Sequence, residues 1–554
     1  MSVMELDENL YRTFLEEMSA LENFRMNYAA AHPRAPLEPD DPDVKRMMEA
    51  LALFSARTRI AALDNIVACR LRLFQQFFPY LLSPMPSLGM LQARLTGQFA
   101  ETALLPKGSE IAVSVKSGDT ALFRTLHDLS LSPVTLVDLK MLLLPNKGFR
   151  LVLQFETPYP RNDEIGTLSF LIDHLRDFKA SLRVFHALES HLTRASILFD
   201  EKATETSKGQ PCDFSFGAAP EGEKHNPDTE QSHPLEVERL FFHYPEQELY
   251  LNIATPEPPR NWRRFTLCLD LDSRWPRNLV VNKDVFQLFT VPIINLRRGM
   301  AHPIVCDGTR ERFPIGHPML EYRFQLHSVL GVYEASKEGM RPIRAGILSG
   351  GKGSYELERL RDERGGERPY LTLHFPDAFE NPRTVTVDAL WLQPWFSETS
   401  GQRRYVAPYS RNIPGIKWEL LGEVAPHTEN RFSDNTEGFM QLLTLSNKHV
   451  MGFEDLQSLL RILGGVANGR FKNAFDLLAD SKVEETPLRR NDSAGMLKHL
   501  YRLYFKAFDS SMRPQVEILA DRIGRILNIW IAHAVVEVRI EMVKAEPSAE
   551  KSSA

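Results

Sequence analysis

The stretch AAAHPRAPLEPDDPDVKRMMEALALFSAR, residues 29–57, places four prolines between two segments of strongly helical composition. Pro33 ends the first segment, because proline disfavours a helical backbone at the residue before it and cannot donate a backbone hydrogen bond. Further on, Asp41 is expected to be an N-cap, Pro42 to hold the first helical position, and Asp43 to lie near the positive end of the helix dipole. The stretch therefore predicts two long helices joined by a proline-rich elbow.

The segment before the elbow repeats large side chains three or four positions apart, a spacing that produces a narrow stripe along one side of a helix. The residues of this N-terminal stripe are Tyr11, Phe14, Met18, Leu21 and Tyr28, with Arg25 at one position of the seam. A narrow stripe suits another helix, so these five residues are our candidates for a partner interface. The second helix should run to about Phe78, and its apolar residues cover more than one face, which predicts burial on several sides.

Composition limits the class of protein. A chain of 554 residues is larger than one hydrophobic core usually supports, so we expect several packed modules. Hydrophobic residues make up 43% and charged residues 25%, which is ordinary for a soluble globular protein. The formal net charge of −6 provides no excess of positive charge for binding nucleic acid.

The four cysteines, Cys69, Cys212, Cys268 and Cys306, form no C-x-x-C pair. This spacing argues against a disulfide framework and a zinc ribbon, and it favours a reducing compartment. The opening MSVMELDENLYRTF is acidic where a secretory signal is basic, so we expect no export by that route. The apolar late segment RILNIWIAHAVVEVRIEM contains several charged side chains, so we expect no transmembrane span there.

Beyond the two helices, short alternating apolar runs separated by Gly, Pro and Asn indicate strands. A helical interval is expected at about residues 165–198, and helices are expected again in EDLQSLLRILGG and SAGMLKHLYRLYFKAFD. We therefore predict an α+β fold with a helical N-terminal hairpin, a β-rich middle of several modules and a partly helical C-terminal region. The predicted divisions are a helical region at 1–95, a β-rich module with a helical insert at 96–200, a loop or boundary at 201–234, one or more β-rich modules at 235–430, a mixed helical region at 431–543 and a disordered tail at 544–554.

The segment GILSGGKG, residues 346–353, has the glycine and lysine spacing of a phosphate-binding P-loop. The eighth position should be Ser or Thr to hold magnesium, but it is Gly353, and Ser354 is displaced by one residue. A glycine-rich hairpin loop is the favoured interpretation. A nucleotide-binding enzyme that uses this loop is the alternative function.

No other motif indicates chemistry. Asp270 and Asp272 resemble the D-x-D of metal-dependent sugar transferases, but structural carboxylates at a strand end are the favoured interpretation. His186 and His191 lie five positions apart, on different sides of a helix, so they should not share a metal ion. We assign no catalytic, cofactor-binding or metal site, although a catalytic set assembled from distant residues stays open.

Longer segments carry a resemblance. Between residues 11 and 88, YRTFLEEMSALENF, AAAHPRAP, DPDVKRMMEALALFSAR and FFPYLLSPMPSL follow one another in an order and spacing that resemble the opening of the TssF family, also called ImpG or VasA. LLPKGSEI, ALFRTLHDLSLSPVTL, HPLEVERLFFHYPEQELYL, LFTVPIINLRRGMAHPI and LLTLSNKHVMGFEDLQSLLRIL are similar to later segments of that family. Two segments depart from it: ALWLQPWFSETS lacks a counterpart cysteine, and the C-terminal family motif is not recognisable after LKHLYRLYFKAF.

The resemblance implies a non-enzymatic structural subunit in the baseplate wedge of a bacterial type VI secretion system, without a cofactor. The implied partners are TssG-like, TssK-like and TssE-like subunits, further TssF copies, the VgrG hub, the sheath and, indirectly, the inner-membrane complex. The implied location is the cytoplasm of a Gram-negative bacterium, with the baseplate docked at the inner membrane. On this view the elbow folds two helices back on each other so that their free faces join a helical bundle with another subunit.

Overall fold

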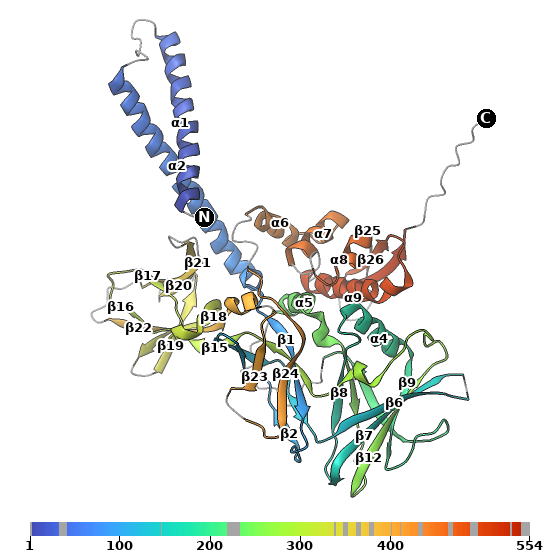
Figure 1. Ribbon diagram of the computed structural model, residues 1–554. Helices are drawn as coiled ribbons and strands as arrows, with labels where there is room; N and C mark the ends of the chain where they lie inside the picture. Colours follow the sequence, from blue (N-terminus) through green and yellow to red (C-terminus); the bar gives the residue numbers. More distant parts are fainter. Residues whose placement is uncertain are drawn as a thin grey trace, which may run out of the picture.

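The computed structural model has an N-terminal helical hairpin, a β-rich middle and a partly helical C-terminal region, so the predicted α+β class is confirmed (Figure 1). It describes residues 3–32, 41–145, 147–218, 233–336, 339–346, 353–361, 367–375, 382–399, 401–409, 412–429, 436–463, 469–487, 497–531 and 534–543. No helix in these ranges is both long and apolar enough to cross a membrane.

Helices α1 (Val3–Ala31) and α2 (Pro42–Phe77) form a hairpin, here called the arm, that projects from the rest of the molecule (Figure 1). The amide of Asp43 donates to Oδ1 of Asp41 at 2.9 Å, which is the geometry of a side-chain N-cap. Pro33 lies outside the described residues. A short helix, α3 (Pro79–Leu82), leads from the arm into the body.

The body begins with a six-stranded antiparallel sheet whose neighbours come from distant parts of the sequence. Its strands, in spatial order, are β23 (Arg404–Pro408), β3 (Glu110–Val115), β4 (Thr120–Thr125), β14 (Thr290–Ile294), β1 (Leu88–Leu95) and β24 (Ile416–Ala425). Strands β2 (Ala103–Leu105) and β5 (Leu129–Leu131) pair with each other as a separate two-stranded antiparallel ribbon. Because β1 pairs with β14 and β24, which come much later in the sequence, the sheet is complete only when most of the chain has folded.

A second, eight-stranded antiparallel sheet shares the hydrophobic core of the first. Its strands, in spatial order, are β13 (Phe286–Gln287), β8 (Thr167–Ile172), β11 (Tyr250–Ala254), β10 (Gln210–Phe216), β9 (Leu192–Phe199), β12 (Trp262–Leu271), β7 (Phe149–Arg161) and β6 (Thr135–Leu143). The expected helix at 165–198 is too long, because only α4 (Phe178–His191) is helical and β8 and β9 occupy its two ends. Asp177 caps α4 by accepting from the Ala180 amide at 2.8 Å. The adjoining short helices are α5 (Pro234–His243), η1 (Pro245–Glu248) and η2 (Lys283–Val285).

Residues 297–392 form a third sheet with a separate hydrophobic core, here called the outer β-unit. Its strands are β15 (Arg297–Met300), β22 (Arg383–Leu392), β18 (Gln325–Ser336), β19 (Gly339–Ala345), β20 (Ser354–Arg361), β21 (Glu367–His374) and β17 (Arg312–Pro314), with β16 (Ile304–Cys306) also paired to β22. Helix η3 (Leu320–Tyr322) precedes β18, and η4 (Pro394–Thr399) follows β22. The unit lies to one side of the body in Figure 1.

The C-terminal region packs three strands and several helices against the second sheet's helices (Figure 1). Its elements are α6 (Thr436–Ser446), α7 (Phe453–Leu463), α8 (Lys472–Leu477), β25 (Leu478–Pro487), β26 (Leu497–Phe505), η5 (Ser510–Met512), α9 (Arg513–Trp530) and β27 (Ala534–Met542). The expected helix in SAGMLKHLYRLYFKAFD is wrong, since Leu497–Phe505 is a strand. Buried residues alternate along it at His499, Tyr501, Leu503 and Phe505, which is the period of a strand with one buried face.

Candidate partner-binding surface

The two helices of the arm touch through small and charged side chains. Ala52 and Ala56 on α2 are completely buried. Arg59 lies on the same side of that helix and forms ion pairs with Glu16 and Glu17 of α1, both at 3.2 Å. Alanines remove little apolar surface from water, so the hairpin contact satisfies little of the hydrophobic content of the arm.

Most of the large apolar side chains of the arm are exposed. Phe24 on α1 is 65% exposed and Phe54 on α2 is 67% exposed. Phe54 lies about 200° around the helix from Ala52, so it points away from the hairpin contact. The other exposed members are Tyr11, Leu15, Met26, Tyr28, Met47, Leu51, Leu53, Leu63 and Ile66. As far as Ile66, the expectation that α2 is buried on several sides is therefore wrong, and so many exposed large apolar side chains on one hairpin indicate an interaction site.

The predicted N-terminal stripe divides into two groups. Tyr11 and Tyr28 are exposed, whereas Phe14, Met18 and Leu21 are half-buried. The structure therefore places part of the stripe near the hairpin contact and part in solvent. Its role as a partner interface stays a prediction.

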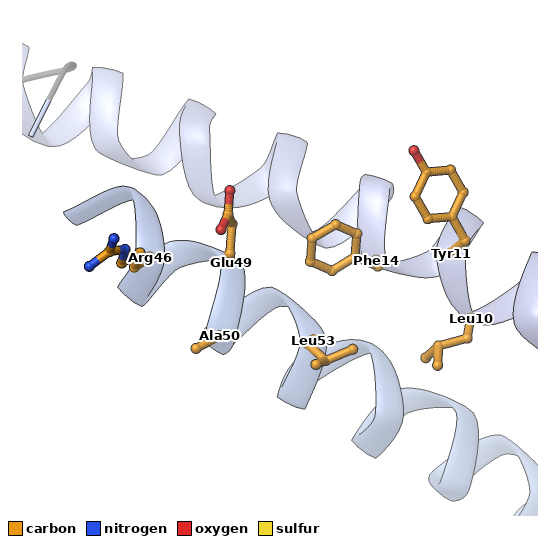
Figure 2. A pocket seen from close by; sticks show the side chains of 7 residues that line it. All are labelled: Leu10, Tyr11, Phe14, Arg46, Glu49, Ala50 and Leu53. Atoms are coloured by element: carbon orange, nitrogen blue, oxygen red, sulfur yellow. The ribbon is translucent and has the colours of Figure 1, made fainter. Parts of the chain in front are cut away.

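An open groove of about 720 Å³ lies between the two helices of the arm (Figure 2). Leu10, Tyr11 and Phe14 of α1 line it together with Leu53 and Ala50 of α2. Arg46 and Glu49 of α2 complete the lining at the end near the elbow, as the close-up shows. An apolar floor with one charged end suits an apolar side chain from an amphipathic helix.

Aromatic stacking fixes the base of the arm to the body. Phe78 stacks on Trp530, at the end of α9, with 5.9 Å between ring centroids and an interplanar angle of 6°. Tyr80 stacks on His233 with a centroid distance of 3.8 Å. Arg239 of α5 donates to the backbone oxygens of Tyr80 and Ser83.

Burial dominates the electrostatics at this base. It lowers the pKa of Arg239 to about 10 and raises the pKa of Tyr80 to about 12. With these pKa values the Arg239 guanidinium is still charged and the Tyr80 phenol is neutral at physiological pH. Two ring stacks and two hydrogen bonds from Arg239 thus hold the base of the arm against the body.

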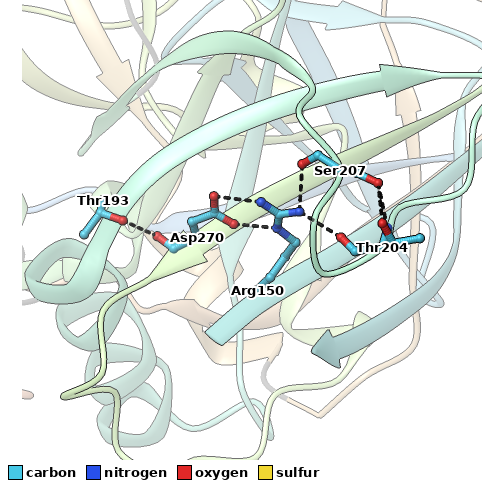
Figure 3. Close-up of polar contacts among 5 residues, drawn as sticks. All are labelled: Arg150, Thr193, Thr204, Ser207 and Asp270. Carbon is cyan, nitrogen blue, oxygen red and sulfur yellow. Dashed lines mark hydrogen bonds and ion pairs between the residues drawn. The ribbon is translucent and has the colours of Figure 1, made fainter. Parts of the chain in front are cut away.

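The first carboxylate of the D-x-D motif, that of Asp270, is occupied by structural partners (Figure 3). Asp270 accepts from Nε and Nη2 of Arg150 at 2.6 and 3.0 Å. Arg150 also donates to the backbone oxygens of Thr204 and Ser207, so the pair anchors the loop after β9. Asp270 raises the pKa of Arg150, which stabilises the charged guanidinium.

The other candidates from the sequence, Asp272, His186 and His191, have structural partners as well. Asp272 pairs with His191 at 3.1 Å and with Arg274 at 2.7 Å, and His186 pairs with Glu517 at 2.6 Å. Within the described residues, no three His, Cys, Asp or Glu side chains are grouped so that they could hold a metal ion. Most of the loop at 346–353 lies outside the described residues.

Sequence reasoning missed two features. The sequence predicts that the outer face of α2 is buried, but the structure leaves Met47, Leu51 and Phe54 exposed. Apolar residues on opposite faces of a long helix indicate that the helix needs more than one neighbour. The buried Arg522 pairs with Glu238 at 3.2 Å and stacks over Phe241 at 3.6 Å. No local spacing relates these distant residues, so only the fold reveals the cluster.

Comparison with solved structures agrees with this architecture. A chain of the type VI secretion system TssK-TssF-TssG baseplate subcomplex matches with a TM-score of 0.70 and 15% sequence identity, over 90% of this chain and 96% of that chain. A chain of the baseplate complex from the type VI secretion system matches with a TM-score of 0.58 and 16% identity, over 96% of both chains. Among curated proteins, none matches this sequence significantly.

The sequence itself matches a family model described as "Type VI secretion system, TssF" over residues 6–390. This match includes the arm, both sheets' central strands and nearly all of the outer β-unit, and it ends within β22. It covers well over half of the 554 residues. The chain therefore belongs to the TssF family, the baseplate proteins of the type VI secretion system.

Proposed function

We propose that this chain is a structural wedge subunit of a type VI secretion baseplate and that its arm binds a TssG-like partner through a helical bundle. The observation that carries the proposal is the exposed apolar surface of the arm, exemplified by Phe24 and Phe54. The similar chain in the TssK-TssF-TssG subcomplex comes from an assembly with two other subunits, which supports the choice of partners. The same family membership supports a structural rather than a catalytic role.

Energetics favour an extended contact over a single anchoring residue. Complete burial of one large apolar side chain contributes about 1.5–3 kcal/mol. Association costs about 4–15 kcal/mol in lost translational and rotational freedom, so several such side chains must be buried together. The 36 residues of α2 span about 54 Å, which is long enough for one partner helix to bury the exposed members on one face, such as Met47, Leu51 and Phe54.

The geometry of the hairpin suits a bundle. Groove residues Tyr11, Phe14 and Leu53 face one side, and Phe54 faces another, so more than one helix can pack on the arm. The elbow serves this arrangement because it returns α2 alongside α1 and leaves both outer faces free. Leu53 and Phe54 are therefore the side chains through which the free faces of α2 would join a bundle with another subunit.

The finer parts of the proposal concern the assembled machine. They include contacts with TssK-like and TssE-like subunits, with further copies of this chain, with the VgrG hub and with the sheath, and indirect contact with the inner-membrane complex. They also include a cytoplasmic location, with the baseplate docked at the inner membrane of a Gram-negative cell. The family resemblance supports each of these.

Co-purification from the native cell tests the proposal. A tagged chain with Phe24→Asp and Phe54→Asp should lose its TssG-like partner, because a charge buried in an apolar contact is strongly unfavourable. Both side chains are exposed in the free chain, so its own fold should be unaffected. The control is Leu175→Asp, at an exposed apolar residue of the body, which should retain the partner. Normal recovery of the partner with the double variant would contradict the proposal.

A further inference from the structure

The outer β-unit is joined to the body at two junctions, at Asn295 and Gln393, which are far apart in the sequence but adjacent in space. The chain leaves the body after Asn295 and returns at Gln393, and most of the buried hydrophobic residues described between these two points form the separate core of the unit. The two cores meet at both junctions, since Leu296, Leu390 and Leu392 pack in the body while Trp391 packs in the unit. A unit held by two adjacent strands can swing about the line through them unless other contacts prevent it.

The side chain of Asn295 connects the two crossing strands to the central sheet. Its Oδ1 accepts from the backbone amide of Gln393 at 2.7 Å. Its Nδ2 donates to the backbone oxygen of Leu122 at 2.8 Å and to Oε1 of Gln393 at 3.2 Å. Its backbone amide donates to Ser87, directly before β1, at 2.8 Å.

The side chain of Gln393 completes the same network and is 0% exposed. Its Oε1 also accepts from the amide of Leu122 at 2.7 Å. Its Nε2 donates to the backbone oxygen of Thr120, on the body, at 3.2 Å and to that of Tyr322, on the outer β-unit, at 2.9 Å. Every donor and acceptor of the two amide side chains is therefore used, and none can be released without leaving a buried polar group unpaired.

A second set of contacts lies beside this amide network. Arg323 follows η3 of the outer β-unit, pairs with Asp119 of the body at 2.8 Å and lies over the ring of Trp395 at 4.8 Å. Trp395 Nε1 donates to the backbone oxygen of Tyr322 at 3.3 Å. Arg323 has a φ of 50°, a left-handed conformation that is unfavourable for a side-chain-bearing residue and persists where surrounding contacts hold it.

We propose that these two sets of contacts form a rigid joint that fixes the orientation of the outer β-unit relative to the body. The amide network prevents the outer β-unit from sliding at Asn295 and Gln393, where the chain passes between the body and the unit. The Arg323 contacts prevent the unit from swinging about the line through these two residues. Arg297 adds a further contact outside the crossings, an ion pair with Glu110 of β3 at 2.9 Å. The arm is fixed to the same body through Phe78, so the arm and the outer β-unit keep a constant relation. This inference stands on the fold and does not depend on the partner of the arm.

Distance distributions between two spin labels in the full chain test the joint. One label is placed at Val305→Cys in the outer β-unit and the other at Val280→Cys in the body, both at exposed positions. Cys69 is exposed and is replaced by serine in all samples. A reference pair at Leu175→Cys and Val280→Cys reports the width expected within the body.

The parent chain should give a single narrow peak, as narrow as that of the reference pair. Gln393→Glu places an oxygen against two backbone oxygens and should abolish this narrow peak. Arg323→Ala combined with Trp395→Phe should broaden it and decides the question if the first variant does not fold. The matched control is Arg312→Ala, which removes an arginine side chain of similar exposure, 57% against 54% for Arg323, from an ion pair inside the unit and should leave the peak unchanged.

Two results would overturn the inference. One is a parent distribution that is broader than the reference pair, which would mean that the unit already swings. The other is a narrow peak in a folded Gln393→Glu chain, or in the Arg323→Ala, Trp395→Phe chain, that matches the Arg312→Ala control.

Discussion

Arg522→Met removes the buried cation that attaches α9 to the body. The side chains of Arg522 and Glu238 are only 6% and 7% exposed, so neither is solvated by bulk water. Arg522 also contacts Glu248 of η1 and lies over the ring of Phe241. Since the family match ends at residue 390, this cluster connects the C-terminal region to residues inside the matched part.

The expected loss follows from what is left behind. Without Arg522, Glu238 remains buried without its ion-pair partner, and breaking a buried pair in this way costs about 3–5 kcal/mol. Burial already raises the pKa of Glu238 against the effect of Arg522, so the carboxyl would take up a proton more readily in the variant. Adding Glu238→Leu removes the stranded carboxylate and should restore most of the loss, because apolar replacements of a buried pair are often neutral.

Amide hydrogen exchange of α9 is the appropriate assay, because it reports the opening of one helix in a chain with several cores. Exchange of residues 513–530 should accelerate strongly in Arg522→Met and return towards the parent rate in the double variant. Arg513→Met is the control, since Arg513 lies on the same helix with a side chain that is 69% exposed and pairs with Glu517. Unchanged exchange in Arg522→Met, or no recovery in the double variant, would refute the reasoning.

Phe14→Asp with Met18→Asp should reduce recovery of a TssG-like partner in co-purification, since it places charge in the N-terminal stripe, and full recovery would assign these residues to internal packing. Asp41→Ala with Pro42→Gly removes the cap and should lower stability by about 0.5–2 kcal/mol, with a larger effect on incorporation into wedge complexes; melting temperature and assembly yield compare the two, and normal assembly would make the elbow a folding element only. Burial lowers the pKa of His243 from 6.5 to about 4, so the folded state binds fewer protons between these values and stability falls as pH falls through this window. His243→Gln should therefore weaken the pH dependence of the urea midpoint between about pH 7 and pH 5, and an unchanged dependence would contradict the shift.

Local signals in the sequence were sufficient for the arm. Pro33 and the Asp41-Pro42 pair predicted where one helix ends and the next begins, because capping and proline geometry act within a few residues of the chain. The structure has α1 ending at Ala31 and α2 starting at Pro42. Membership of the TssF family could also be predicted from the segments that resemble it, beginning with YRTFLEEMSALENF, and it is confirmed over residues 6–390.

Local signals failed where a partner segment decides the structure. Leu497–Phe505 reads as a helix by composition, but it is a strand because β25 and β27 are placed on either side of it. Similarly, β8 and β9 replace the ends of the expected helix because their pairing strands, β11 and β12, come much later in the chain.

The sequence by itself determined that the chain has two long N-terminal helices with more apolar surface than one face can hold. Only the tertiary structure decided which of that surface remains free: Ala52 and Ala56 occupy the hairpin contact, and Phe54 is left in solvent. The same holds for Asn295 and Gln393, which are unremarkable in sequence and meet only because β14 and β22 end side by side. Periodicity specifies which side chains share a face, whereas burial depends on what packs against that face, and that neighbour can come from any part of the chain.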